Sequence, residues 1–128
     1  MVDRGKMSQE QKEMVMGFIT PTLSYDDLSD VDIAVEAVYE NLDLKQDIFK
    51  TLDEVTKDDA ILASNTSGLD IDAIASVTNR PELVVGTHFF SPANIMRLLE
   101  VVRGEKTSNE TLATIMSCLL YTSPSPRD

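Results

Sequence analysis

The stretch VDIAVEAVYEN, residues 31–41, decides the fold. Its first part, residues 31–38, is nearly continuous in apolar and β-prone residues, which is typical of a strand buried on both faces of a parallel sheet. Asn41 then caps a predicted helix that runs to about Lys57, with an apolar stripe formed by Leu44, Ile48, Phe49, Leu52 and Val55. A short buried strand at residues 60–63 follows. A strand–helix–strand unit of this kind predicts parallel strands joined by a right-handed crossover.

The same alternation continues toward the C-terminus. A second amphipathic helix is predicted at residues 70–77 and a third strand at 83–87. After Pro92 the pattern predicts a fourth strand at 98–102 and a helix from residue 109 to about 119. The chain is therefore expected to be an α/β protein with a doubly wound, mostly parallel sheet.

The N-terminal part leaves alternatives open. Residues 1–16 are charged and rich in methionine, which suits either a helix with a thin apolar face or a frayed terminus. We predict a short strand at residues 18–20 that ends at Pro21. Residues 24–29 predict one helical turn capped by Ser24.

Composition limits the classes of function. The chain has 128 residues, enough for one domain, and 22 acidic against 11 basic residues give a formal net charge of -11. This balance argues against a nucleic-acid partner. The single cysteine fits a reducing compartment, and we find no apolar run of membrane-spanning length and no signal-peptide core. We expect a cytoplasmic protein without membrane partners.

Polar residues follow three of the predicted strands. The first strand ends in residues 38–41 (VYEN), the second in 64–67 (SNTS) and the third in 88–92 (HFFSP). Ligands bind at the carboxyl ends of strands in an open parallel sheet, so these groups predict a binding site at one edge. The alternative for residues 64–67 is simple capping of the next helix.

His88 and Glu100 are the candidate acid–base pair. Histidine has an ordinary pKa of about 6.5, which suits proton transfer near neutral pH. Glu100 lies on an apolar strand, LLEVV, where a carboxylate is costly without a partner. A Glu–His pair would remove that cost and orient the imidazole. The alternatives are a structural histidine and a glutamate that faces solvent on an edge strand.

Lys45 lies in the first turn of the helix that Asn41 caps. A cation there opposes the helix dipole by about 0.3–1 kcal/mol, and an anionic or hydroxyl-rich ligand nearby would compensate. The alternative is a solvated lysine. The sequence contains no metal-ligand cluster and no G-x-G-x-x-G phosphate loop.

Three long motifs carry a family resemblance: DIAVEAVYENLDLKQDIF (32–49), ASNTSGL (63–69) and GTHFFSPANIMRLLEVVRG (86–104). From about Gly17 to Met116 the chain resembles the NAD-binding domain of the L-3-hydroxyacyl-CoA dehydrogenases. The resemblance implies a partial Rossmann-type sheet whose first strand and glycine-rich turn would precede residue 1, and NAD as the cofactor. The third motif is most similar to bacterial multifunctional β-oxidation proteins, although 3-hydroxybutyryl-CoA dehydrogenases share most of the pattern.

The resemblance also implies roles for individual residues. His88 would be the base that takes the 3-hydroxyl proton, Glu100 its partner carboxylate, and Ser67 a neighbour of the substrate oxygen and the nicotinamide. The ribose side of NAD would be contacted by Val38, Tyr39, Glu40 and Lys45. Ser91 stands where many members of the family have asparagine, and that position contacts the cofactor.

The implied substrate is an acyl-CoA, and the implied activity is NAD-dependent oxidation of L-3-hydroxyacyl-CoA in β-oxidation. The full-length enzyme would be a homo-oligomer or part of a multifunctional protein, with a helical domain after residue 117. We expect residues 1–117 to be a partial domain, and we expect the 128-residue polypeptide neither to bind NAD tightly nor to turn over. The alternatives are a short-chain 3-hydroxybutyryl-CoA dehydrogenase, a crystallin-like relative without activity, and a non-enzymatic binding module.

Residues 118–128, CLLYTSPSPRD, have a different character. The string resembles the one-frame translation of a transposon-end sequencing adapter. We expect a non-native tail here, and the alternative is an ordinary Ser/Pro-rich tail.

Overall fold

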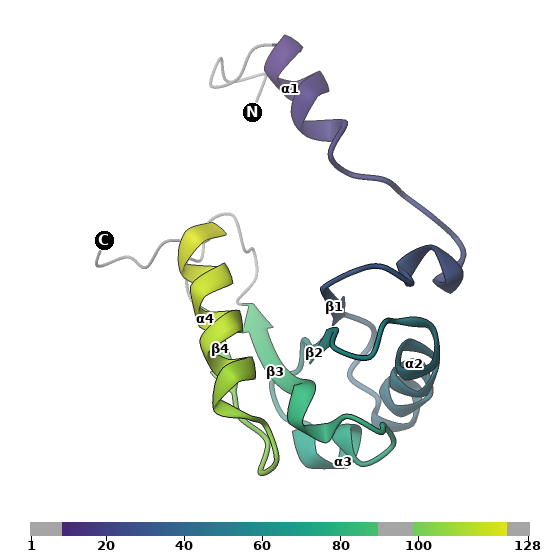
Figure 1. The fold of residues 1–128 in the computed structure, drawn as a ribbon, viewed down its shortest axis with the longest axis vertical. Coiled ribbons are helices and arrows are strands. Elements are labelled where there is room, and N and C mark those ends of the chain that lie inside the picture. Colours follow the sequence, from purple (N-terminus) through teal and green to yellow (C-terminus); the bar gives the residue numbers. More distant parts are fainter. Residues whose placement is uncertain (1–8, 90–98, 123–128) are drawn as a thin grey trace.

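The computed structural model describes residues 9–89 and 99–122. Figure 1 shows the arrangement of the elements, which in chain order are α1 (Gln9–Met16), the 3-10 turn η2 (Tyr25–Leu28), β1 (Ile33–Glu36), α2 (Leu42–Val55), β2 (Ile61–Ser64), α3 (Ile71–Ala75), the 3-10 turn η3 (Pro81–Leu83), β3 (Val84–Phe89), β4 (Leu99–Val102) and α4 (Asn109–Thr122). All helices and strands predicted from residue 31 onward are present, with ends that differ by a few residues.

The four strands form one sheet in the order β1-β2-β3-β4. β1 pairs with β2 and β2 with β3 in parallel, whereas β3 and β4 are antiparallel. The predicted α/β class with a mostly parallel sheet is therefore confirmed. Sequential parallel neighbours require a crossover connection, and α2 and α3 lie in the two connections.

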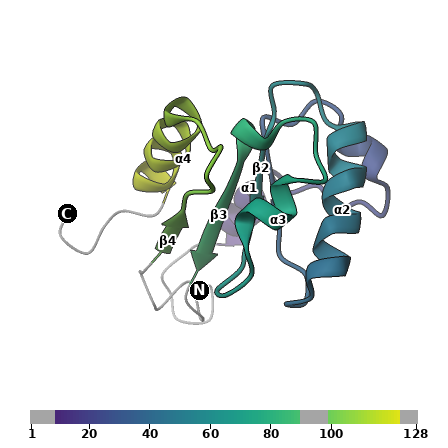
Figure 2. The same cartoon turned by 90° about the horizontal axis from the view of Figure 1, so that it is seen from below.

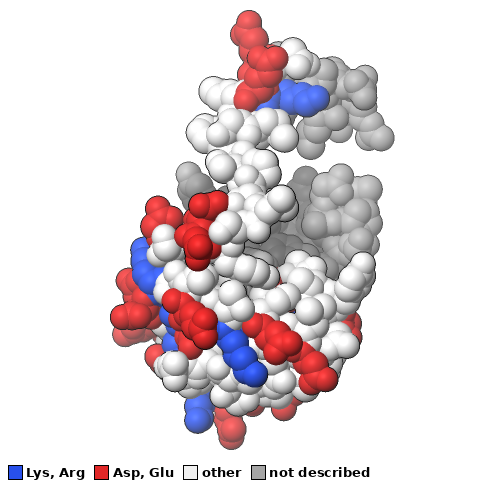
Figure 3. All heavy atoms as spheres, turned by 90° about the vertical axis from the view of Figure 1, so that its right-hand side faces the viewer, with Lys and Arg blue, Asp and Glu red and all other residues white. Residues whose placement is uncertain are grey.

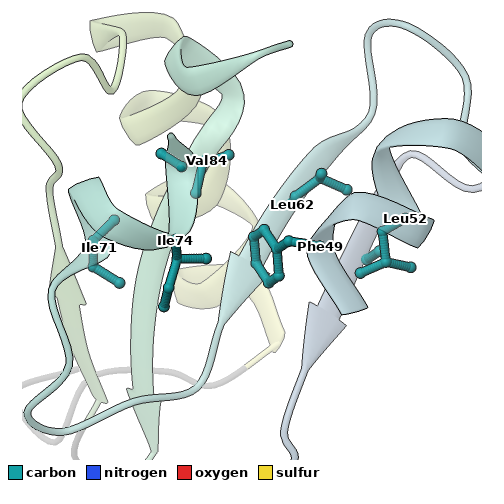
Figure 4. Close-up of a cluster of buried hydrophobic side chains, with 8 residues drawn as sticks. Phe49, Leu52, Leu62, Ile71, Ile74 and Val84 are labelled. Atoms are coloured by element: carbon teal, nitrogen blue, oxygen red, sulfur yellow. The ribbon is translucent and has the colours of Figure 1, made fainter. Parts of the chain in front are cut away.

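Helices cover both faces of the sheet, as Figure 2 shows. Successive side chains of a strand point to opposite faces. On one face Leu62 and Val84 pack with residues of α2 and α3, and this core is drawn in Figure 4. On the other face Ala63 and Val85 pack against Ile115 of α4. The sheet is thus doubly wound.

α2 is the helix that the Asn41 cap predicts. The Asn41 side chain accepts a hydrogen bond from the backbone N–H of Leu44 at 3.0 Å. Phe49 and Leu52 from the predicted apolar stripe are buried against the sheet, each contributing roughly 1.5–3 kcal/mol. The helix ends at Val55, because Thr56 is already extended.

The prediction that residues 31–38 are buried on both faces is wrong. Regular strand structure covers only Ile33–Glu36, and Val35 is 54% exposed. Ala34 and Glu36 point toward α2 and are buried, whereas Val35 points to the face on which α4 packs. α4 packs with residues of β2 and β3 on that face and leaves Val35 uncovered.

The N-terminal part contains a helix, α1, but none of its residues is buried. Figure 1 shows α1 apart from the sheet. The strand predicted at residues 18–20 is wrong: this segment is irregular and exposed, and no strand of the described part pairs with it. The turn capped by Ser24 is confirmed, since its hydroxyl accepts from the Asp26 backbone N–H.

The acidic surplus lies on the surface. On the face drawn in Figure 3, carboxylate side chains are spread over the molecule with few basic side chains among them. No helix in the described ranges is long and apolar enough to cross a membrane.

Candidate active site

The carboxyl ends of β1, β2 and β3 lie at one edge of the sheet, because the three strands are parallel neighbours. We call this edge the rim and define it as residues 37–41, residues 65–67 and His88. The loops after β1 and β2 are joined by a backbone hydrogen bond of 2.8 Å from Asn65 N–H to the Glu36 carbonyl. The predicted convergence of polar groups at strand ends is therefore present in the structure.

Glu40 and Ser67 are in direct contact across the rim. One Glu40 carboxylate oxygen accepts from the Ser67 backbone N–H at 3.0 Å and from the Ser67 hydroxyl at 3.1 Å. The other oxygen accepts from the Thr66 hydroxyl at 2.6 Å. The cluster thus binds a carboxylate of its own chain, whereas Asp70 provides the cap of α3. The alternative in which residues 64–67 merely cap that helix is wrong.

These contacts change the acidity of Glu40. The hydrogen bond from the Thr66 hydroxyl, followed by that from the Ser67 backbone N–H, lowers the pKa of the Glu40 carboxyl below its ordinary value. Burial opposes this shift, and the positive charge of Lys45, whose ammonium nitrogen is 4.0 Å away, lowers the pKa least. Hydrogen bonding to the charged form therefore keeps Glu40 a carboxylate while 44% of its side chain stays exposed.

Lys45 is neither solvated nor exposed to a ligand: its side chain is 0% exposed. Its Nζ donates to Glu36 Oε2 at 2.6 Å, to the Val38 carbonyl at 3.3 Å and to the Asn65 carbonyl at 3.1 Å. These partners match the three N–H donors of an ammonium group. The anion that compensates this cation at the start of α2 is therefore the protein's own Glu36, and the solvated-lysine alternative is wrong.

Sequence reasoning missed Glu36. Its side chain is fully buried, and besides Lys45 it accepts from the Ser64 hydroxyl at 2.6 Å and from the Val38 N–H at 2.8 Å. A signal was available, because Glu36 stands within an apolar strand where an unpaired carboxylate would be costly. The same argument led to the partner predicted for Glu100.

His88 and Glu100 are opposite residues in the register of β3 and β4. His88 Nδ1 lies 3.9 Å from Glu100 Oε1, an ion-pair distance that is longer than a hydrogen bond between those two atoms. The His88 side chain is 24% exposed and that of Glu100 57% exposed. Antiparallel pairing of β4 thus brings together two residues that are twelve positions apart in the sequence, as predicted.

The remaining predicted site residues differ in exposure. Val38 and Tyr39 are exposed at the rim, within reach of a ligand. Ser91 lies outside the described residues. Thr66, which sequence reasoning did not separate from its neighbours, is buried and its hydroxyl also accepts from the Leu69 N–H. Within the described part of the chain, no cluster of three or more metal-ligating side chains occurs.

A mostly parallel sheet with helices on both faces, and with a carboxylate and hydroxyls at the carboxyl ends of its strands, defines an α/β domain of the Rossmann type. The model of one domain family, the NAD-binding domain of 3-hydroxyacyl-CoA dehydrogenase, matches residues 1–122. The chain belongs to this family. NAD is the cofactor that the description of the family names, in agreement with the prediction.

Individual relatives agree with this assignment. The chain is 56% identical over 96 residues to a peroxisomal bifunctional enzyme of Danio rerio, covering 75% of this chain and 13% of that protein. It is 44% identical to a 3-hydroxybutyryl-CoA dehydrogenase of Clostridioides difficile, covering 90% of this chain and 41% of that protein. The crystal structure of an (S)-3-hydroxybutyryl-CoA dehydrogenase from Ralstonia eutropha superposes with a TM-score of 0.91 at 37% identity, covering 95% of this chain and 43% of that one. The chain thus spans less than half the length of these relatives.

Proposed function

We propose that this chain is part of an NAD-dependent dehydrogenase that oxidises L-3-hydroxyacyl-CoA to 3-oxoacyl-CoA in fatty-acid β-oxidation. The observation that carries the proposal is the placement of His88 opposite Glu100 on the two strands beside the rim. Membership of the 3-hydroxyacyl-CoA dehydrogenase family supports the substrate class.

The exposed groups of the rim fit the ribose part of NAD. Glu40 is an ionised carboxylate held by Thr66 and Ser67, and a carboxylate oxygen accepts hydrogen bonds from ribose hydroxyls. The exposed residues Ser67, Val38 and Tyr39 lie beside it. We assign direct cofactor contacts to these residues and, by the family resemblance, to Ser91. Lys45 does not contact the cofactor directly, because it is buried and its three N–H donors already bond to Glu36, Val38 and Asn65. It affects the site only by holding the loops that carry the exposed groups.

The proposed chemistry divides one oxidation into two transfers. The residues of the rim would hold the ribose of NAD, and the bound cofactor would supply the hydride-accepting chemistry at C3 of the substrate. The imidazole of His88 accepts the proton of the 3-hydroxyl group, so that the C–O bond becomes a carbonyl and no charge is left on oxygen. Glu100 orients the imidazole and stabilises its protonated form. By the family resemblance, Ser67 lies beside the substrate oxygen and the nicotinamide, while its O–H is donated to Glu40.

His88→Gln in the full-length enzyme tests this role. We expect kcat for NADH formation from 3-hydroxybutyryl-CoA to fall by about 10²–10⁴-fold, with little change in NADH affinity. The matched control is Glu105→Gln, an exposed polar substitution beyond the end of β4. NADH formation by His88→Gln at the wild-type rate would show that the proton-transfer role is wrong.

The relatives also motivate the choice of substrate for this test. The zebrafish relative is named as a peroxisomal bifunctional enzyme, whereas the clostridial relative is named as a 3-hydroxybutyryl-CoA dehydrogenase. Comparing kcat/KM for C4 and longer 3-hydroxyacyl-CoA substrates separates a β-oxidation enzyme from the short-chain alternative.

We further propose that the full-length enzyme is a homo-oligomer or part of a multifunctional protein and that it works in the cytoplasm.

We also propose that residues 1–117 form a partial domain and that residues 118–128 are a non-native tail. α4 and the family match both reach residue 122, so they include the first five residues of the proposed tail, and the composition of residues 118–128 is what carries this proposal. Comparing the source DNA with an independent read of the same gene tests the tail. Because the chain contains no G-x-G-x-x-G turn, we expect the isolated 128 residues to bind NAD weakly and to show no turnover. Measurable oxidation of 3-hydroxybutyryl-CoA by that chain would contradict this expectation.

A further inference from the structure

We propose that Glu36 is a positioning residue that holds the rim in the shape that binds the cofactor, an inference that rests on the proposed function. Glu36 lies at the last position of β1, and its carboxylate is completely buried beneath the rim. It therefore cannot touch the cofactor itself. Its effect is exerted through the groups that it binds.

The carboxylate of Glu36 gathers groups from both sides of the rim. On the β1 side, its Oε2 accepts from the Val38 N–H at 2.8 Å, which fixes the first turn of the loop after the strand. On the β2 side, its Oε1 accepts from the Ser64 hydroxyl at 2.6 Å. Both oxygens are thus used, and the two neighbouring strand ends are connected by one side chain.

Lys45 extends this connection through the charge of Glu36. With its ammonium group held 2.6 Å from Glu36 Oε2, Lys45 donates to the carbonyl of Val38 in one loop and to that of Asn65 in the other. A buried ammonium group is retained only when an anion pairs with it. Glu36 is therefore the group that keeps Lys45 between the two loops.

The two loops held in this way carry the exposed groups of the site. Val38 is two residues before Glu40, and Asn65 is two residues before Ser67. Glu40 and Ser67 hydrogen-bond to each other directly above the buried pair, and Glu40 Oε1 is 4.0 Å from Lys45 Nζ. A change in the distance between the loops would displace both of the groups that we assign to the ribose and the nicotinamide.

The fold alone does not require this buried ion pair. A buried ion pair contributes little net stability compared with well-packed apolar side chains of similar volume. A second buried pair, Arg80 with Asp53 at 2.8 Å, lies at the opposite end of α2 from Lys45. Arg80 therefore provides a control with similar burial and no connection to the rim.

The test uses NADH fluorescence titration of the full-length enzyme. Glu36→Gln keeps the shape of the side chain but removes the charge that holds Lys45. We expect NADH to bind about tenfold more weakly, the loss of roughly one hydrogen bond's worth of binding free energy. Arg80→Lys is expected to lower the unfolding temperature while NADH affinity stays within about twofold of wild type.

A double variant separates positioning from folding. Glu36→Gln/Lys45→Met removes the unpaired buried cation, so the unfolding temperature should rise above that of Glu36→Gln while NADH binding stays weak. Wild-type NADH affinity in the double variant would overturn the inference and leave the proposed function intact. If the wild-type enzyme itself neither bound NADH nor oxidised 3-hydroxyacyl-CoA, the proposed function would fail, and the inference with it.

Discussion

His88 and Glu100 lie directly opposite each other across the β3–β4 ladder, with Nδ1 of the histidine 3.9 Å from Oε1 of the glutamate. More than half of the glutamate side chain is exposed, so water screens its charge. The register of two strands, rather than a loop, holds the two side chains together. Backbone pairing of this kind restricts the position of the imidazole before any ligand is bound.

The exposure of Glu100 determines how much Glu100→Gln should cost. The substitution keeps the size of the side chain and removes the negative charge that faces His88. We expect kcat to fall roughly tenfold to a hundredfold, less than for His88→Gln, because solvent already screens the interaction. Steady-state NADH formation at saturating substrate measures the effect. A loss equal to that of His88→Gln would mean that Glu100 does more than orient and stabilise the imidazole.

The site was predictable from sequence where a carboxylate stands on an apolar strand. That reasoning placed Glu100 beside His88, although the Glu100 side chain is exposed and its carboxylate needs no buried partner. It applies fully to Glu36 in β1, whose carboxylate is buried. The identity of the partner was not predictable, because Lys45 reaches Glu36 only through the way α2 crosses the sheet. A lysine in the first turn of a helix has the same local pattern whether it is solvated or buried.

The fold, like the site, was predictable only where the sequence pattern is local. Periodicity predicted the strands and helices from residue 31 onward, since each apolar stripe has a definite repeat. It did not predict the antiparallel direction of β4 or the exposure of Val35, because both depend on how distant elements pack. The strand expected at residues 18–20 failed for a related reason: a strand needs a partner to hydrogen-bond with.

Glu40 should make stability depend on pH. A carboxyl group with a lowered pKa in the folded state stabilises the fold above its ordinary pKa of about 4.3, and this contribution disappears as the pH falls through the folded value. We expect Glu40→Gln to be less stable than wild type at pH 7 and to approach it in stability in more acidic buffer. Urea unfolding midpoints at a series of pH values measure the difference. A gap that stayed constant down to pH 3 would contradict the assigned hydrogen bonds.

Arg80 should be the most important single side chain for the C-terminal end of α2. Its guanidinium pairs with Asp53 and donates to the carbonyls of Lys57 and Ala60 at 2.6 and 3.2 Å, as well as to those of Asp53 and Thr56. Arg80→Ala should cost about 3–5 kcal/mol of unfolding free energy, because it removes the cation beside the Asp53 carboxylate and the donors to four backbone carbonyls, leaving Asp53 only its hydrogen bonds from Asn79. Arg80→Lys should cost about 1–3 kcal/mol, because one ammonium group cannot reach all of these acceptors. Urea unfolding of both variants gives the two values. Near-equal stability of wild type and Arg80→Lys would show that the planar guanidinium group, with its several N–H donors, is not needed here.

Two buried threonines should respond in opposite ways to the same substitution. Among the described residues, the Thr87 hydroxyl is the one buried side-chain polar atom without a hydrogen-bond partner, and it lies on the α4 face of β3. Thr87→Val replaces that hydroxyl by a methyl group, so we expect the unfolding free energy to rise by up to about 1 kcal/mol.

The matched control is Thr107→Val, because the Thr107 hydroxyl donates to the Val84 carbonyl at 2.7 Å and accepts from the Gly104 N–H at 2.9 Å. Losing both bonds should cost about 1–3 kcal/mol. Urea unfolding of the two variants compares them directly, and a destabilised Thr87→Val would show that its hydroxyl is in fact satisfied in solution.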